Sequence, residues 1–405
     1  MRAVPWDIFC TVIDNFGDIG VTWRLSRQLA AEHGVAVRLW VDDLEAFRRL
    51  CPEVDPELDI QHLLPSPGGR GSPGVEVRRW TAPLPEVEPG ALVIEALACT
   101  LPDAFIERMA QHDPKPVWLN LEYLSAEDWV EGVHGLPSPH PRLPLLKHFF
   151  MPGFTTRTGG LTRERGLSAA RDAFQTDADA QAVFWADLGL PPAQADELRL
   201  TLFSYENRAL PGLLTAWAEG DRAIRACVPE GKALPQIAAW FGVAAPPAGA
   251  TLHRGRLTLH VLPMLDLDAY DRLLWACDLN FVRGEDSFLR AQYAARPMVW
   301  QAYPQEEAAH LIKLDAFLRR YCADQADDLA RLTQDFWRAW NREAAADTHW
   351  TRWLAALPRL GSHARAWDSA LAKHTDLASK LLIFFNKQVG SQPFSAIPFS
   401  QEPPQ

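Results

Sequence analysis

The sequence predicts an α/β protein in which two Rossmann-like domains face each other across a cleft, and three observations lead to this fold class. The 405 residues exceed what one hydrophobic core usually organises and fit two domains with a tail. Apolar residues make up 48% of the chain and charged residues 22%, as in globular proteins. In each half, short apolar runs alternate with amphipathic segments, the pattern of parallel strands joined by helices.

The first half opens with the apolar run 6–13, predicted as a strand, and a glycine-containing loop leads from it into a helix over 19–33. Val21, Leu25 and Leu29 recur at i, i+4 and i+8, which gives this helix one apolar stripe. The same alternation then predicts strands over 35–41, 75–80, 91–97 and 117–121 and helices over 44–50 and 101–111. The proline-rich stretch 132–144 and the polar stretch 155–165 are expected to be excursions outside the core.

A second series begins near residue 198 and repeats the alternation. It predicts strands over 198–204, 223–228, 257–262 and 278–282 and helices over 210–219, 235–241, 270–277 and from Ser287 onward. A helical segment over 366–390 is expected to pack back on the first domain, and the Pro-, Ser- and Gln-rich residues 391–405 to form a flexible tail. The expected domains are therefore 1–185 and 186–365.

Charge and composition exclude several classes of function. The net charge of −11 and the lack of a basic tract weigh against nucleic acid as a partner, although a local arginine pocket can still hold one small phosphorylated ligand. The six cysteines have no metal-type spacing and are expected to be buried free thiols, and the twelve histidines show no HxxxH pairing, so no metal is expected. Without a signal-peptide core or a run of roughly 20 apolar residues, the protein is expected to be cytoplasmic, away from the membrane.

The first candidate site is the loop Asp14-Asn15-Phe16-Gly17-Asp18, between the first strand and the first helix. Ligands of open parallel sheets bind outside the carboxyl ends of the strands, so this loop points into the expected cleft. Asp18 as the helix N-cap, with Asp14 opening a turn, is an equally good interpretation of the pattern. The crowding of two acids and Asn15 in one short loop favours a catalytic base and its support, because a cap needs only one acid.

The second candidate is the turn Arg283-Gly284-Glu285-Asp286-Ser287, where a strand of the second domain leads into a helix. A glycine-containing turn at a helix N-terminus suits a diphosphate, and Arg283 and Ser287 add a cation and a hydroxyl. Glu285 and Asp286 repel phosphate and point instead to a sugar hydroxyl or a cationic acceptor. The alternative is that Asp286 and Ser287 cap the helix while Glu285 complements its dipole.

Several aromatic residues fit two different roles. Phe203 and Tyr205 end a predicted strand, where they can stack on a base, although core packing of Phe203 is equally possible. Most of the sixteen tryptophans, such as Trp23, Trp240 and Trp300, lie in apolar runs and are expected in the core, so none is assigned to the site.

Taken together, the segments 14–25, 202–206 and 281–287 resemble the protein-arginine rhamnosyltransferases of bacterial elongation factor P, and the resemblance runs over nearly the whole chain. It implies a GT-B architecture, TDP-β-L-rhamnose as the donor and elongation factor P as the protein acceptor, with no cofactor or metal. It further implies transfer with inversion onto one arginine, with the acceptor approaching the first domain and the second domain binding the nucleotide sugar.

The resemblance also implies residue roles. Asp18 is the general base, Asp14 its support and Glu285 a second catalytic acid. The implied donor-binding residues are Asn15, Phe16, Gly17, Asp18, Phe203, Tyr205, Leu267, Arg283, Gly284, Glu285, Asp286 and Ser287. The chain departs from the family at Leu267, where the family has a glutamine that contacts thymine, so main-chain groups are expected to read the base here.

Two other functions stay open. A GT-B enzyme or sugar-nucleotide epimerase with a different donor would share the same loops, and a non-catalytic protein would use the cleft to dock a partner. The acids Asp14, Asp18 and Glu285 weigh against the second alternative, because a retired site has no need of them.

Overall fold

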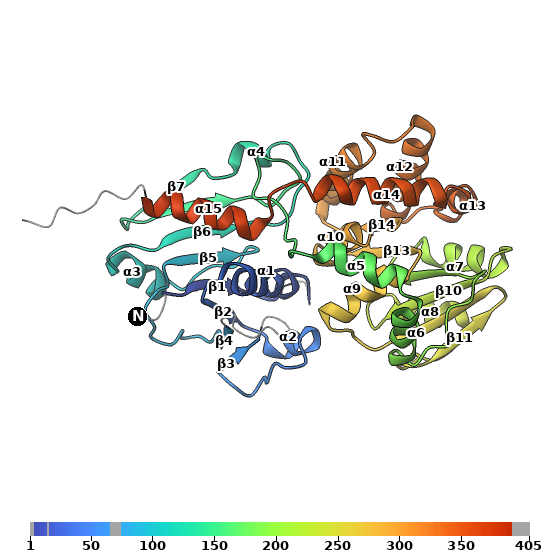
Figure 1. Cartoon of the computed structure of the whole chain (residues 1–405), viewed down its shortest axis with the longest axis horizontal. Coiled ribbons are helices and arrows are strands. Elements are labelled where there is room, and N and C mark those ends of the chain that lie inside the picture. Colours follow the sequence, from blue (N-terminus) through green and yellow to red (C-terminus); the bar gives the residue numbers. More distant parts are fainter. Residues whose placement is uncertain (1–3, 14–15, 65–73, 391–405) are drawn as a thin grey trace, which may run out of the picture.

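The computed structural model describes residues 4–13, 16–64 and 74–390, and its two sheets lie one after the other along the long axis (Figure 1). Asp14, Asn15 and the expected tail 391–405 lie outside the described residues. The first domain consists of β1 (Trp6–Cys10), α1 (Gly17–His33), β2 (Val37–Val41), α2 (Leu44–Leu50), β3 (Ile60–Leu63), β4 (Val75–Arg79), β5 (Leu92–Ala96), α3 (Asp103–Gln111), β6 (Val117–Leu121), α4 (Val130–Val133), β7 (Pro137–Pro139) and β8 (Leu146–Phe150).

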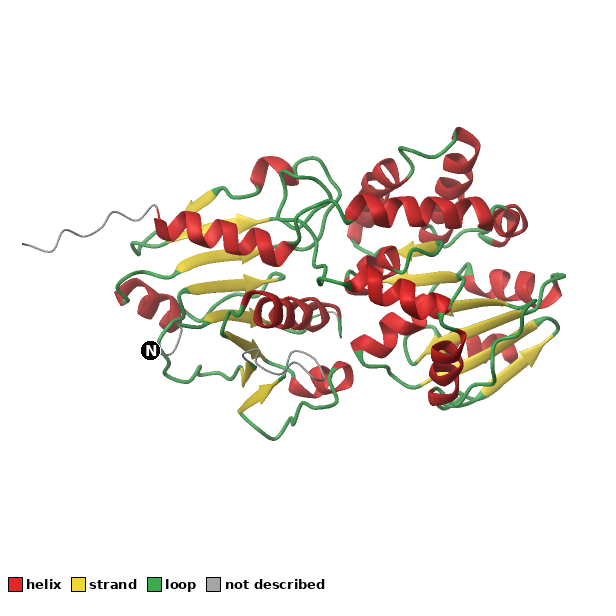
Figure 2. Cartoon of the chain, in the orientation of Figure 1, coloured by secondary structure: helices red, strands yellow, loops and turns green. Residues whose placement is uncertain are grey.

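The first sheet has the strand order β3-β4-β2-β1-β5-β6-β8-β7, with only the outer strands β3 and β7 antiparallel to their neighbours. Central strand β1 pairs in parallel with β2 and β5 and is fully buried. Its side chains alternate between two cores: Ile8 and Cys10 join the core that contains α1, whereas Phe9 packs with Phe105 of α3 on the other face. Helices therefore cover both faces, as Figure 2 shows.

The second domain repeats this plan with a six-stranded sheet of order β11-β12-β10-β9-β13-β14, in which only β11 is antiparallel. Its elements are α5 (Leu167–Thr176), α6 (Ala178–Asp187), β9 (Leu198–Leu202), α7 (Leu210–Glu219), β10 (Ile224–Pro229), α8 (Leu234–Phe241), β11 (Thr251–Arg254), β12 (Leu257–Leu262), α9 (Leu267–Ala276), β13 (Leu279–Arg283), α10 (Asp286–Tyr293), β14 (Met298–Gln301), η1 (Glu306–Ala308), α11 (Ala309–Tyr321), α12 (Asp327–Asn341), α13 (Asp347–Ala355) and α14 (Leu357–Leu371). Two Rossmann-like domains confirm the predicted fold class.

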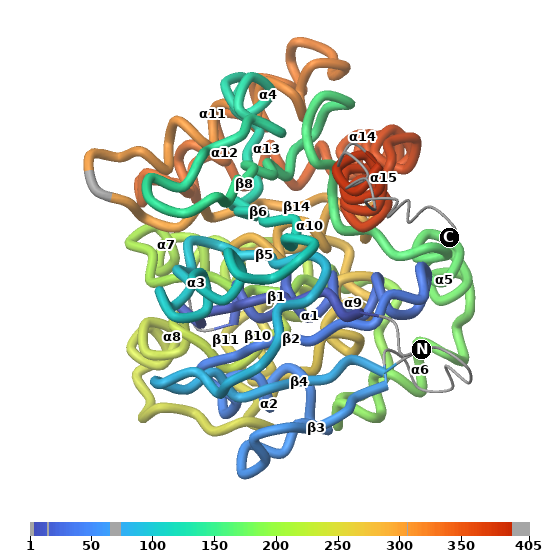
Figure 3. Tube along the Cα trace, turned by 90° about the vertical axis from the view of Figure 1, so that its left-hand side faces the viewer, coloured from blue at the N-terminus to red at the C-terminus, as the bar shows by residue number. Residues whose placement is uncertain are grey.

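The chain passes between the domains twice. Leu167 of α5 and Trp185 of α6 belong to the core of the second domain. These two helices therefore pack with the second domain, although they precede the expected boundary at 185/186. The expected helical segment 366–390 is the end of α14 and all of α15 (Leu377–Gly390). Leu371 packs in the second core and Leu381 in the first. Figure 3, viewed along the long axis, shows both red helices nearly end-on, so together they span the two domains.

Periodicity missed β3, β7, β8, β11 and β14. Strands β3, β7 and β11 are antiparallel edge strands of four residues or fewer with several exposed side chains, so they carry too little apolar pattern to be distinguished from loops. All six cysteines are free and buried, which confirms the expected buried thiols. Within the described residues, no helix is both long enough and apolar enough to cross a membrane.

Candidate active site

The candidate site lies where the carboxyl ends of strands from the two domains face each other. Asp18 follows β1 and Tyr123 follows β6, which places both at the same edge of the first sheet. Arg283 ends β13 and Phe203 directly follows β9, the neighbouring strand of the second sheet. Parallel strands end at a common edge, so residues far apart in the sequence come together here.

Asp18 is the second residue of α1 and only 2% exposed, whereas the N-cap position belongs to Phe16 and has no side-chain cap. The Asp18 carboxylate points back toward β1, and its Oδ2 accepts the Ile13 N–H at 2.9 Å. The interpretation of Asp18 as the helix cap is therefore wrong. Its carboxylate is held by the loop at the end of β1.

The turn between β13 and α10 carries the second carboxylate. Gly284 has a φ of 65°, a left-handed conformation that favours glycine, and Glu285 follows at the N-cap position without a side-chain cap. The Glu285 carboxylate instead reaches the first domain, where its Oε2 accepts the Leu124 N–H at 3.0 Å. One acid of this turn thus bridges the two domains.

Burial, together with the negative charges of Asp18 and Asp286, raises the pKa of Glu285 to about 8. The Leu124 N–H and the Lys313 ammonium act in the opposite direction, because both favour the ionised carboxylate. At neutral pH the Glu285 carboxyl group is therefore mostly protonated, and a bound cation would favour its ionisation.

Asp286 does not cap α10 either, because its carboxylate forms an ion pair with Nε of Arg24 at 2.8 Å. Arg24 lies on α1 of the first domain, is 1% exposed, and also donates to both carboxylate oxygens of Asp271 at 3.0 Å. Arg290 of α10 binds Asp271 from the other side and pairs with Glu164. Glu164 keeps a low pKa of about 2 despite the opposing effect of burial, because both arginines lie beside it. We call these five residues the interdomain ion cluster.

Arg283 is held by aromatic rings. Its guanidinium lies 4.4 Å from the ring centre of Phe203 and 4.5 Å from that of Tyr205. Phe203 also packs edge-on against Tyr270 at 5.7 Å. Tyr205 is buried in the second domain, and its N–H donates to Gln301 Oε1 at 2.9 Å.

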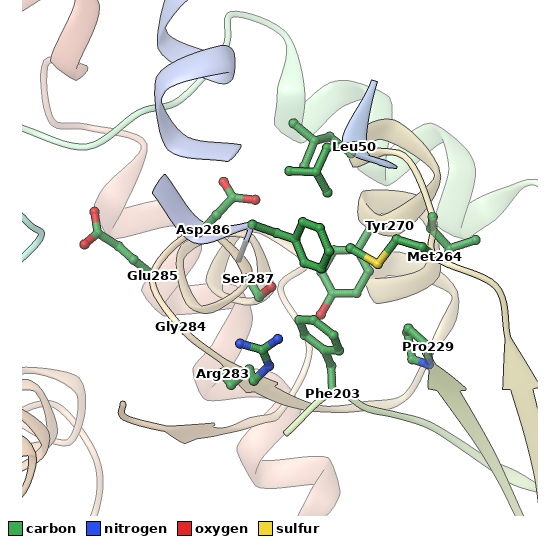
Figure 4. A pocket seen from close by; sticks show the side chains of 14 residues that line it. Leu50, Phe203, Pro229, Met264, Tyr270, Arg283, Gly284, Glu285, Asp286 and Ser287 are labelled. Carbon is green, nitrogen blue, oxygen red and sulfur yellow. The ribbon is translucent and has the colours of Figure 1, made fainter. Parts of the chain in front are cut away.

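Two cavities meet at this point. The smaller, of about 550 Å³, is lined by Phe16, Phe203, Met264, Tyr270, Arg283 and Ser287, among others. Figure 4 shows the rings of Phe203 and Tyr270 and the Met264 side chain gathered on one side of it, while the Glu285 carboxylate points away from them. The larger, of about 1160 Å³, is lined by Asp18, Tyr123, Trp300, His310, Lys313 and others. Among the residues that the structure describes, Gly17, Gly284 and Glu285 line both cavities.

The site residues predicted from the sequence are divided between the two cavities. The smaller cavity brings together Phe16, Gly17, Phe203, Leu267 and the run 283–287, including Asp286, whose carboxylate is engaged by Arg24. The larger cavity receives Asp18. The Leu267 side chain is buried, and its carbonyl accepts from Arg24 at 3.3 Å, so this carbonyl is directed at the domain interface.

Sequence reasoning missed several lining residues. Tyr123 and Leu124 follow a correctly predicted strand, so the rule that drew attention to Asp18 also applied to them. Trp300 was expected only in the core, yet it lines the larger cavity and donates to the Gly284 carbonyl at 2.9 Å. Lys313 comes from α11, which no sequence signal connected to the site.

Comparison with known proteins agrees with this architecture. Residues 6–386 match the family described as Elongation-Factor P (EF-P) rhamnosyltransferase EarP. A protein-arginine rhamnosyltransferase of Pseudomonas putida is 48% identical over 391 residues, covering 96% of this chain and all of that protein. One of Pseudomonas aeruginosa is 47% identical over 380 residues, covering 94% and 98%. A solved structure described as the structural basis for EarP-mediated arginine glycosylation of translation elongation factor EF-P superposes with a TM-score of 0.65 at 33% identity, covering 95% of this chain and 99% of that one.

Proposed function

The chain belongs to the elongation-factor P rhamnosyltransferase family of GT-B glycosyltransferases, and we propose that it transfers L-rhamnose from TDP-β-L-rhamnose to an arginine of elongation factor P. Within this proposal the transfer inverts the anomeric carbon, takes place in the cytoplasm and needs no metal. The relatives are protein-arginine rhamnosyltransferases, which supports a guanidinium as the acceptor group.

One observation carries the proposal: two cavities share a wall that contains Glu285, and each offers different chemistry. The smaller cavity has aromatic rings, the Arg283 guanidinium and the N-terminus of α10, a combination suited to a base and a diphosphate. The larger cavity has Asp18 on its wall, and its volume of about 1160 Å³ exceeds that of an arginine side chain. A donor in the first and a guanidinium in the second would meet at the shared wall.

Guanidinium needs help to act as a nucleophile, because its lone pairs are delocalised and its pKa exceeds about 12. In the proposed reaction, Asp18 and Glu285 hold the guanidinium by charge-assisted hydrogen bonds, and Asp18 takes one proton as the new C–N bond forms. The bond between the anomeric carbon and the TDP oxygen breaks at the same time, on the opposite face of the sugar. Arg283, Ser287 and the α10 N-terminus would stabilise the leaving diphosphate.

Thymine recognition in this proposal falls to groups other than a side-chain amide at Leu267. The apolar wall of the smaller cavity, with Met264 and Phe203, offers stacking surface, and main-chain N–H and C=O groups would read the pyrimidine edge.

The test is to incubate the protein with TDP-β-L-rhamnose and elongation factor P and measure the intact mass of the factor. We expect a gain of one deoxyhexose, which peptide mapping assigns to an arginine. An unchanged mass would overturn the proposal and favour a different donor, which a thermal-shift screen of nucleotide sugars would then identify.

A further inference from the structure

A further hollow adjoins the smaller cavity and carries an excess of positive charge. It has a volume of about 1730 Å³, and the charged residues that line it are Arg48, Arg49, Lys232, Arg283, Glu45 and Glu230. Its wall shares Phe16, Met264 and Arg283 with the smaller cavity, so it adjoins the proposed donor site. We call this hollow the basic groove.

Two segments of the chain lead from the smaller cavity into the basic groove. Arg48 and Arg49 lie in the last turn of α2, and Leu50, which follows them, lines the smaller cavity. Pro229 ends β10 at the same cavity, and three residues later Lys232 lines the groove. Figure 4 shows Leu50 and Pro229 on the same side of the smaller cavity. The groove therefore receives cations from both domains.

The cations that belong to the groove alone are not neutralised within the protein. Arg48, Arg49 and Lys232 are exposed, and none of them forms an ion pair with another residue of 4–13, 16–64 or 74–390. The Lys232 ammonium lies 5.8 Å from the centre of the Tyr205 ring, and the Arg283 guanidinium lies 4.5 Å from the same centre. Two cations beside one ring repel each other, and an anion bound near them would offset this repulsion.

The charge of the groove is opposite to that of the protein as a whole. The net charge of −11 repels an anion that approaches from solution. In the groove, four cations face two carboxylates among the described residues, which leaves a net charge of +2. A concave surface with an excess of one charge concentrates ligands of the opposite charge and raises their association rate. The proposed donor carries a diphosphate, whereas the proposed acceptor group is a cation, so the groove suits the donor.

We propose that the basic groove is the entrance for the nucleoside diphosphate donor. Arg48 and Arg49 of the first domain and Lys232 of the second attract the diphosphate from solution, and Arg283 receives it at the smaller cavity. The inference rests on the proposed function, which assigns the smaller cavity to TDP-β-L-rhamnose. The groove and the larger cavity have no lining residue in common among those described, so the donor and the acceptor arginine approach by separate routes.

The test measures how fast TDP binds to the full-length protein, by stopped-flow fluorescence with a fluorescent TDP derivative. The variant combines Arg48→Gln, Arg49→Gln and Lys232→Gln, all at exposed positions. We expect the association rate constant at low salt to fall about tenfold, while the dissociation rate constant changes less than about twofold. At about 1 M salt, where charges are screened within about 3 Å, the wild type and the variant should differ by less than about twofold.

A second triple variant removes the same amount of charge elsewhere and serves as the matched control. It combines Arg222→Gln, Arg256→Gln and Arg331→Gln, which are also at exposed positions. Arg222 and Arg256 precede β10 and β12, at the edge of the sheet opposite the site, and Arg331 lies on α12. Its association rate constant should stay within about twofold of the wild-type value.

The outcomes separate this inference from the proposed function. If the wild-type protein does not bind TDP, the proposed donor fails. If TDP binds and the groove variant associates as fast as the wild type at low salt, the groove is not the entrance. Equal slowing in both triple variants would also overturn the inference, because the effect would then come from the net charge of the protein.

Discussion

The two turns that lead into α1 and α10 begin alike and are held in different ways. Each follows a buried strand, contains glycine and places carboxylates in the first turn of a helix. Asp18 of the first turn is bound by Ile13 of its own loop, whereas Glu285 and Asp286 of the second are bound by Leu124 and Arg24 of the other domain. The first acid is thus positioned within one domain, and the other two depend on how the domains sit together.

Because of this difference, the two turns should respond differently to mutation. A change at Asp18 should affect the reaction and leave the domain interface intact. A change among the partners of Asp286 should affect the interface first and the reaction through it.

The largest effect is expected from Asp18→Asn. The amide oxygen still accepts from Ile13, but the side chain no longer takes a proton, so kcat should fall by roughly 10³-fold while TDP binding is retained. Single-turnover transfer and the thermal shift with TDP measure the two properties. Asp42→Asn is the matched control, because the exposed Asp42, which follows β2, accepts the N–H of Val12 at 2.9 Å, and Val12 is the neighbour of Ile13. Near-normal turnover in Asp18→Asn would remove the base assignment.

Arg24→Ala should give the next largest effect, on stability. It leaves the buried Asp286 without its nearest cation, and we expect the free energy of unfolding to fall by about 3 kcal/mol. Chemical denaturation measures the change. Arg27→Ala is the control, since Arg27 lies on the same helix and pairs with Asp268 across the same interface in a more exposed setting, so its loss should cost less than about 1 kcal/mol. Equal losses in the two variants would contradict the special role of the buried interdomain ion cluster.

The same contrast explains how much the sequence could predict. The strand over 117–121, the helix over 210–219 and the turns before α1 and α10 follow from local periodicity and glycine placement, so they were predicted. The partners of those turns were not predicted. Leu124 binds through its backbone N–H, which any residue could supply, and nothing in the sequence of α1 marks Arg24 as a partner of Asp286. For Asp286, capping was a reasonable alternative from residue type. It was wrong because the carboxylate pairs with Arg24 of the other domain, and such a contact leaves no local signal in the sequence.

The cavity walls show the same limit. Phe203, Arg283 and Ser287 belong to continuous motifs and were found in the sequence. Trp300 and Lys313 reach the larger cavity from β14 and α11, whose placement depends on the packing of the whole second domain. Sequence pattern identified the residues of the smaller cavity well and those of the larger cavity poorly.

A smaller effect is expected from pH, through Glu285. Its pKa of about 8 in the free protein means that roughly a tenth of it is ionised at pH 7, and holding a guanidinium requires the ionised form. The kcat/KM for elongation factor P should therefore rise about tenfold between pH 7 and 9 as Glu285 ionises. The charged groups that act on Glu285 are Asp18, Asp286 and Lys313. The folded-state pKa lies above the unfolded value, so this group's contribution to stability is present at low pH and lost as pH rises through 8.

Glu285→Gln serves as the control for this profile. The amide does not titrate, so the limb near pH 8 should disappear while overall activity is lower. A wild-type profile that is flat between pH 7 and 9 would contradict the assignment.

The smallest effect is expected from Ser287→Ala, on the donor side of the shared wall. The Ser287 hydroxyl lines the smaller cavity at the first turn of α10, where loss of one hydrogen bond to a phosphate oxygen should weaken TDP binding by about 1 kcal/mol, or roughly fivefold. Calorimetric titration with TDP measures this, and kcat at saturating donor should change less than KM. Ser369→Ala is the control, because the exposed Ser369 hydroxyl donates to the Arg365 carbonyl of its own helix. If Ser287→Ala instead lost turnover as severely as Asp18→Asn while binding TDP normally, the division between a donor-binding turn and a base-carrying turn would fail.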